Sequence, residues 1–392
     1  MLKLLFVTTV DLSGDSGGEH SATKDIILAL AEHNQVELSL LCPRPSNDMP
    51  EEIRKQLFGE NIAFFYKAAG ESIIGSHLAP QADLLFKGIK NIKQYRGHDA
   101  LIVRHGLVTI SPLLLSKVFH LPYIVLSRGG EGDSREKYRF TRLLKALFWL
   151  NMRFADYVYT ATLDRKEMVD AIRKPTQTEA TFLPNAVDPD LFSPIDQQEA
   201  RSQIKYDLDD NEFVVGYVGS FLDGHALPEL IEAVANLIQE GHQVKLVLVG
   251  QGDNYEKCRS LVKYFDISES VIFTGWIDHE DVKIYISACD ILYGVTKAKS
   301  SSMLKCCEYL ACSRPIIGSD ISEFEFVKEL DAGWLLPEIE SEEIQDVIIN
   351  SKSTLRSNRI AKGARGREYV LNNRTWRGQS ATITSQISNI RK

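Results

Sequence analysis

The feature that most constrains this sequence is an alternation of short apolar runs with segments of helical periodicity, which occurs twice along the chain. In the first half the apolar runs occupy 3–10 (KLLFVTTV), 36–43, 99–106, 122–130 and 155–162. In the second half they occupy 212–221 (EFVVGYVGSF), 244–253, 270–277, 290–295 and 314–319. Such alternation is typical of βαβ units, which build parallel sheets.

A non-periodic stretch separates the two halves. Residues 182–194 (FLPNAVDPDLFSP) are rich in Pro, Asn and Asp, and the full chain of 392 residues is longer than one typical core requires. We therefore predict an α/β protein of two Rossmann-like domains, 1–190 and 191–371, with parallel sheets facing a central cleft. The amphipathic end, 372–392, is expected to pack back on the N-terminal domain. Ligands of open parallel sheets bind beyond the carboxyl ends of the strands.

Composition and charge exclude several classes of protein. The net charge of −8 argues against a nucleic-acid binder, because phosphate neutralisation needs a basic surface. The six cysteines contain no C-x-x-C pair, which favours a reducing cytoplasm and core thiols rather than a metal site. The first residues, MLKLLFVTTVDLSGD, fit a buried strand better than a signal peptide, and no apolar run is long enough to cross a membrane. The expected location is cytoplasmic.

The segment 300–320 (SSSMLKCCEYLACSRPIIGSD) has the pattern of a helix followed by a strand. On a continuous helix Ser300 and Glu308 would lie just over two turns apart on one face. Two interpretations are open: a site for a polyhydroxylated, anionic ligand, or an ordinary joint between helix and strand. The D-x-D pattern within 206–213 is interpreted as a solvated loop, so no metal is expected.

Five stretches in the second half occur in an order and spacing that resemble the GT-B glycosyltransferases, specifically the retaining glycosyltransferase family 4. They are PNAVDPDLFSP, VVGYVGSF…LIEAV, VKLVLVGQGD, VIFTGWIDHEDVKIYISACDILY and MLKCCEYLACSRPIIGSD. The resemblance implies a GT-B architecture, with a nucleotide-sugar donor on the C-terminal domain and an acceptor on the N-terminal domain.

The resemblance implies a role for each end of the segment 300–320. Glu308 would accept hydrogen bonds from the ribose hydroxyls of the donor, since a carboxylate offers two acceptor oxygens to a vicinal diol. The family commonly has a second glutamate eight residues earlier, which holds the sugar, and here that position is Ser300. Sugar recognition is therefore expected to differ from that of relatives with this glutamate. One possibility is that the backbone amides of Ser301, Ser302 and Met303 bind the sugar.

The donor diphosphate would lie at the start of the same helix. Its free N–H groups, with Leu304 among them, and the side chain of Lys305 favour an anion, although an exposed lysine is often only solvated. Gly219 and Ser220 are the other phosphate candidates. His225 fits a histidine of some relatives and would be cationic beside a diphosphate, or else a loop histidine with internal partners.

Three further residues resemble the nucleotide-binding turns of the family. Gly250 would lie near the nucleotide, and Gly275 and Trp276 near the base. Glycine lets a backbone approach a ligand closely, but it also simply ends strands. The alternative for Trp276 is partial core packing.

In the N-terminal half, Gly17 and Gly18 match the glycine loop that faces the donor phosphates. His105, Arg128 and Glu131 follow neighbouring strands and are the catalytic candidates. The basic, aromatic segment 134–154 could rest on anionic lipid at the inner face of the membrane, or pack its aromatic residues on the sheet.

The predicted function is transfer of a sugar, with retention, from a nucleoside diphosphate sugar to a hydroxyl of a glycan, a glycolipid or another acceptor. The expected setting is biosynthesis of cell-surface polysaccharide or glycoconjugate, without a metal or a cofactor other than the co-substrate. The partners are the donor and a glycan or lipid-linked acceptor. Two alternatives are a nucleotide-sugar 2-epimerase of GT-B fold and a non-catalytic nucleotide-sugar-binding subunit.

Overall fold

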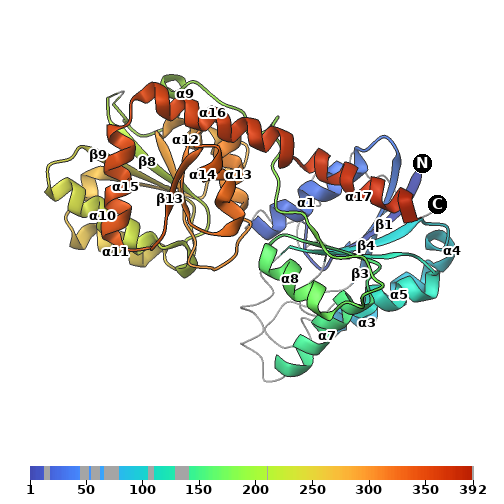
Figure 1. The fold of residues 1–392 in the computed structure, drawn as a ribbon. Helices are drawn as coiled ribbons and strands as arrows, with labels where there is room; N and C mark the ends of the chain where they lie inside the picture. The colour runs from blue at the N-terminus through green and yellow to red at the C-terminus, as the bar shows by residue number, and fades with distance from the viewer. Residues whose placement is uncertain are drawn as a thin grey trace. The chain divides into compact units, whose positions relative to one another are not determined.

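The computed structural model describes residues 1–12, 18–44, 53, 62–65, 79–104, 110–128, 141–209 and 211–390, with the backbone alone for 141–145. The chain divides into two compact units (Figure 1). The first unit consists of Met1–Asn185 together with Trp376–Lys392, and the second of Ala186–Thr375. The expected boundaries were 190/191 and 371/372.

The first unit contains a seven-stranded parallel sheet with the order β3-β2-β1-β4-β5-β6-β7. Its strands are β1 Leu2–Val7, β2 Val36–Pro43, β3 Ile62–Phe65, β4 Ala100–Arg104, β5 Tyr123–Ser127, β6 Tyr157–Thr160 and β7 Thr181–Phe182. β4 and β5 are buried along their whole length, as expected for inner strands of a parallel sheet covered on both faces.

The helices of this unit are α1 Gly18–Ala31, α3 Ala79–Lys90, α4 Ile92–Tyr95, α5 Ile110–Phe119, α7 Thr141–Phe154, α8 Leu163–Ile172 and α17 Trp376–Ile390. The last helix, α17, lies beside α1 (Figure 1). It buries Trp376, Ile383 and Ile387, and the Thr384 hydroxyl lies 3.3 Å from His33 Nε2 of the segment after α1.

In α7, two of the aromatic residues of the basic segment pack on the sheet. Phe148 is fully buried, and Trp149 packs against the same core cluster, with the Arg165 guanidinium over both rings. These contacts agree with the packing interpretation for this part of the helix. Tyr138 and Phe140 lie outside the described residues.

The second unit contains a six-stranded parallel sheet with the order β10-β9-β8-β11-β12-β13. Its strands are β8 Phe213–Val218, β9 Val244–Val249, β10 Val271–Gly275, β11 Ile291–Gly294, β12 Ile316–Ser319 and β13 Gly333–Leu336. β13 was not predicted. From β8 the chain first builds outward to β9 and β10, then returns to add β11 on the other side of β8.

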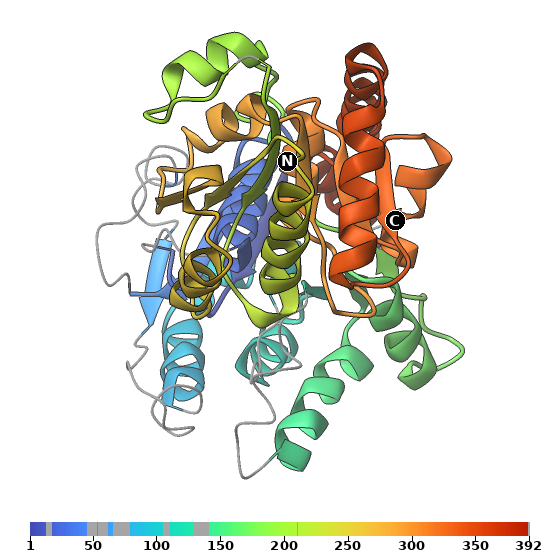
Figure 2. The same ribbon diagram turned by 90° about the vertical axis from the view of Figure 1, so that its left-hand side faces the viewer.

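Helices cover both faces of this sheet: α9 Gln197–Gln203, α10 Leu227–Gln239, α11 Tyr255–Tyr264, α12 Val282–Ala288, α13 Leu304–Ala311, α14 Glu325–Glu329, α15 Ser341–Ser353 and α16 Arg356–Asn373. One core cluster joins the sheet to α10, α11 and α15, and α10 and α15 lie side by side (Figure 2). The other joins it to α9, α12, α13, α14 and α16. The predicted fold class, two α/β units with parallel sheets, is confirmed.

Among the described helices, none has both the length and the apolar character needed to cross a lipid bilayer. All six cysteines are free thiols, and five of them are buried.

Candidate functional site

The candidate residues of the second unit gather in the loops at the carboxyl edge of its sheet. β8 lies between β9 and β11, so the loops that follow β8 and β11 leave neighbouring strands in opposite directions. Open α/β sheets bind their ligands at such a point, where the order of the strands reverses.

Glycine residues allow the loops after β8, β9 and β10 to approach one another closely. The N–H of Gly219 donates to Val249 O at 3.0 Å, and the N–H of Gly250 donates to Gly275 O at 2.8 Å. Gly250 has a φ of +116°, and a Cβ there would lie 2.2 Å from Gly219 O. Backbone packing between loops therefore accounts for the glycine at position 250.

Lys305, in the first turn of α13, reaches the loop after β8. Its Nζ donates to the Tyr217 hydroxyl at 2.9 Å and lies 4.3 Å from the centroid of that ring. A Cβ on Gly219 would lie only 3.0 Å from this Nζ. The absence of a side chain at position 219 thus leaves room for the ammonium group.

The charges of this cluster are set mainly by burial. Burial lowers the pKa of Lys305 to about 7. Burial and the neighbouring Lys305 charge lower the pKa of His225 to about 4, while its Nδ1 lies 2.8 Å from the Tyr217 hydroxyl and 2.7 Å from Ser220 O. His225 is therefore neutral at pH 7. Lys305 is therefore the titrating cation of the cluster, and a histidine cation beside a bound diphosphate stays a prediction.

Glu308 lies three residues further along α13 and is largely buried. Its Oε1 is 3.6 Å from His279 Nε2, which comes from the loop after β10, and the His279 ring packs edge-on against Phe192. Trp276, in the same loop, is 50% exposed, so it is available to a ligand rather than packed in the core. The sequence did not single out His279, although it lies three residues after Trp276.

The expected alignment of Ser300 and Glu308 on one helix face is wrong. α13 begins only at Leu304, with Met303 as its N-cap residue, because the preceding serines form no helical turn. Serine hydroxyls compete for backbone partners and so disfavour helix interiors. Instead, the Ser300 hydroxyl donates to the carboxylate of Glu323.

Glu323 was not predicted, because it comes from the turn after β12 and only the fold brings it to Ser300. It is 4% exposed. Together with Ser301, Ser302 and Met303 it lines a small pocket at the start of α13. The helix start carries no side-chain cap.

The candidates of the first unit are placed only in part. Gly18 begins α1, whereas Gly17, His105 and Glu131 lie outside the described residues. Arg128 is buried and donates to Leu183 O at 3.0 Å and to Gln379 Oε1 at 2.7 Å, with its guanidinium 5.5 Å from the Trp376 ring centroid. Burial, with the charge of Arg104, lowers its pKa to about 9. These contacts show that the guanidinium of Arg128 joins α17 to the segment after β7 within its own unit, and its catalytic role stays a prediction.

Comparison with known proteins identifies the second unit. Residues 212–351, from the start of β8 into α15, match the family described as "Glycosyl transferases group 1". An uncharacterized glycosyltransferase of Methanocaldococcus jannaschii is 19% identical over 60% of this chain and 58% of its own length. Alpha-D-kanosaminyltransferase of Streptomyces kanamyceticus is 22% identical over 62% of this chain and 64% of its own. The chain thus spans less than two thirds of the length of these two curated relatives.

Solved structures resemble the chain over its whole length. Sucrose-phosphate synthase from Thermosynechococcus elongatus has a TM-score of 0.79 at 18% identity, covering 100% of this chain and 99% of that one. HepE of Anabaena in complex with UDP and glucose has a TM-score of 0.75 at 16% identity, covering 99% and 100%. These likenesses show the GT-B fold. The match of residues 212–351 to the group 1 family supports the prediction of a glycosyltransferase for the second unit.

Proposed function

Because the second unit carries a group 1 glycosyltransferase domain, we propose that the protein is a retaining transferase of family 4 type. It moves a sugar from a nucleoside diphosphate sugar to a hydroxyl of a glycan, a glycolipid or another acceptor, as in the assembly of cell-surface glycans. The observation that carries the proposal is the position of Lys305 and Glu308 on adjacent turns of α13, within the matched domain and beside the strand-order reversal.

The diphosphate of the donor is assigned to the start of α13. The uncapped N–H groups and the helix dipole favour an anion there, and Lys305 adds a cation on the same turn. Gly219 lets the phosphate oxygens approach this ammonium. In this proposal these groups stabilise the leaving diphosphate without a metal or another cofactor.

The nucleoside is assigned to Glu308 and the loop after β10. The carboxylate of Glu308 accepts from the two ribose hydroxyls, and the exposed ring of Trp276, with the backbone of Gly275, contacts the base. The complex of HepE with UDP and glucose supports a nucleoside diphosphate sugar as the class of donor.

The sugar is assigned to Ser300 and Glu323. The hydrogen bond between them places a hydroxyl and a carboxylate side by side. When a sugar binds, this bond can be replaced by hydrogen bonds from both groups to the sugar hydroxyls. In this arrangement Glu323 supplies the carboxylate that position 300 lacks. The backbone of Ser302, Met303 and Leu304 lies between this pair and the diphosphate position.

The acceptor is assigned to the first unit, with His105 and Glu131 as the candidates for its catalytic groups and Gly17 and Gly18 beside the donor phosphates. In the transfer step the acceptor oxygen bonds to the anomeric carbon, and the bond from that carbon to the diphosphate oxygen breaks. The leaving diphosphate takes the electron pair and accepts the hydroxyl proton.

A turnover assay tests the proposal. The purified full chain is incubated with a panel of nucleoside diphosphate sugars, with and without extracts of membranes and glycans, and both free nucleoside diphosphate and the sugar product are measured. We expect nucleoside diphosphate release that depends on the acceptor extract and is lost in Glu308→Gln. Conversion of the donor sugar without acceptor would point to an epimerase, and binding without turnover would point to a non-catalytic subunit.

A further inference from the structure

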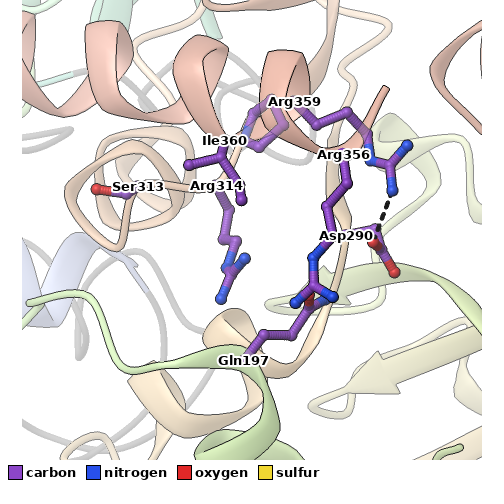
Figure 3. A pocket seen from close by; sticks show the side chains of 8 residues that line it. Gln197, Asp290, Ser313, Arg314, Arg356, Arg359 and Ile360 are labelled. Atoms are coloured by element: carbon purple, nitrogen blue, oxygen red, sulfur yellow. Dashed lines mark hydrogen bonds and ion pairs between the residues drawn. The ribbon is translucent and has the colours of Figure 1, made fainter. Parts of the chain in front are cut away.

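A second polar pocket lies at the opposite edge of the same sheet (Figure 3). It is lined by Gln197, Asp290, Ser313, Arg314, Pro315, Arg356, Arg359 and Ile360. Asp290 directly precedes β11 and Pro315 directly precedes β12, whereas the loops of the proposed donor site follow the carboxyl ends of the strands. A four-residue strand spans about 13 Å, so this pocket is separate from the proposed donor site.

The lining of the pocket has an excess of positive charge. Its three arginines face a single carboxylate, Asp290. That carboxylate already pairs with Arg359 at 3.2 Å and with Arg201 at 3.1 Å, and it also accepts the N–H of Val214 at 2.9 Å. Asp290 therefore has little capacity left for the other two arginines.

Arg314 and Arg356 use few of their donors. Arg314 makes one long hydrogen bond, 3.4 Å to Ile195 O, and its buried Nε has no acceptor among the described residues. Arg356 makes one bond, 3.2 Å to Gln197 Oε1. Within the described part of the chain neither forms an ion pair, although a guanidinium has five N–H donors. Figure 3 shows their side chains extending along the two sides of the same space.

The start of α16 adds to this imbalance. Arg356 is its first residue and Arg359 lies in its first turn, where the helix dipole disfavours cations. The first turn contains no acidic residue, and no side chain caps the helix. Burial lowers the pKa of Arg314, and the nearby charge of Asp290 offsets this only in part. An anion in the pocket would offset both the placement of cations at the helix start and the burial of the Arg314 charge.

We propose that this pocket binds a phosphate group, either inorganic phosphate or a phosphate monoester. Arg314 and Arg356 would hold the oxyanion from two sides, since guanidinium groups match the geometry of phosphate oxygens. The site does not depend on the proposed transferase activity. Ser313 and Arg314 follow Cys312, the C-cap residue of α13, and the other end of this helix carries Lys305, so one helix connects the two anion positions.

The test measures phosphate binding by the full chain at constant ionic strength, by calorimetry and by thermal unfolding. Inorganic phosphate and glycerol 2-phosphate are compared with chloride, in the wild type and in Lys305→Gln, which removes the cation of the donor site. We expect saturable binding in both proteins. In the double variant Arg314→Gln/Arg356→Gln the affinity should fall by about tenfold or more, because two charge-assisted contacts are lost. Tighter binding of glycerol 2-phosphate than of phosphate would identify a monoester as the ligand.

The matched control is Arg259→Gln, which removes an exposed arginine of α11 in the same unit and should bind phosphate as the wild type does. If the double variant fails to fold, Arg356→Gln carries the test, because it changes an exposed side chain. Unchanged phosphate affinity in that single variant would overturn the proposal. Loss of phosphate binding in Lys305→Gln alone would assign the anion to the donor site instead.

Discussion

The ammonium of Lys305 lies 2.9 Å from the hydroxyl of Tyr217 and 4.3 Å from the centroid of its ring. Tyr217 belongs to β8, and Lys305 follows β11, so this contact joins the two strands between which the strand order reverses. Because burial lowers the pKa of Lys305 to about 7, its charge changes in the neutral range. Its neighbour His225, with a pKa of about 4, stays neutral there.

Binding of a nucleoside diphosphate should depend on the protonation of Lys305. Above pH 7 a growing fraction of the free protein has a neutral amine, which must take up a proton to bind the anion. We expect the affinity to fall with rising pH, by at most about tenfold per pH unit. Calorimetry at pH 8 in buffers of different ionisation enthalpy should show proton uptake in the wild type and none in Lys305→Gln. Equal uptake in both proteins would contradict this role.

The same pKa affects stability in the absence of ligand. Lys305 holds a proton up to pH 10.5 in the unfolded chain but only up to about 7 in the folded protein. Between these values the unfolded state binds more protons, so this residue makes the free energy of unfolding rise as the pH increases from 7 toward 10.5. Urea unfolding across this window should show a steeper rise in the wild type than in Lys305→Met.

Glu308→Gln should weaken binding of nucleoside diphosphates by about ten- to a hundredfold, because the charged acceptor of the ribose hydroxyls is lost. The measurement is calorimetric titration with a panel of nucleoside diphosphates. Glu325→Gln, an exposed glutamate at the start of α14, is the matched control and should bind normally. Unchanged affinity in the Glu308 variant would refute the assignment.

Glu323→Gln should weaken binding of the sugar part of the donor without weakening binding of the nucleotide part. The variant keeps the size of the side chain but loses the charge beside Ser300. We expect nucleoside diphosphate affinity within about twofold of the wild type, and a loss of affinity for the sugar-bearing donor of about tenfold. Comparison of the two ligands in one titration series measures this. A parallel loss for both ligands would place Glu323 at the nucleotide instead.

Gly250→Ala should destabilise the second unit by about 1–3 kcal/mol or more, because its φ of +116° disfavours a side chain and the new Cβ would clash with Gly219 O. Gly224→Ala is the control in the adjacent loop, where an added Cβ meets no heavy atom within 4 Å. Urea unfolding of the two variants should give a clear difference. Equal stabilities would show that the loop relaxes around the added methyl group.

Arg128→Gln should destabilise the first unit by about 2–4 kcal/mol, since removal of the guanidinium leaves buried carbonyl oxygens without a donor. Nucleoside diphosphate affinity should stay unchanged, because the assigned donor site lies in the other unit. Arg96→Gln removes an exposed arginine of the same unit and should have little effect. A variant of normal stability that has lost only turnover would support the catalytic assignment.

Most of the inner strands were predictable because they are continuous apolar runs bounded by turns. β3 (IAFF), β13 (GWLL) and the two-residue β7 were not, since such short segments carry no periodicity. The proximity of Lys305 and Glu308 could be predicted because they share a helix. His279 and Glu323 could not, because they reach the site from loops after other strands. Ser300 was misplaced because helical spacing does not reveal where a helix begins.

The structure also has a consequence for protein synthesis. Residues 1–185 leave the ribosome before Ala186–Thr375, and α17, which packs on α1 and supplies Gln379 to Arg128, is translated only after both. The first unit therefore lacks one of its helices while Ala186–Thr375 is synthesised. The second unit, in contrast, is one continuous segment and can fold as soon as it has been made. During that interval the surface of α1 that α17 later covers is open to chaperones and to neighbouring nascent chains.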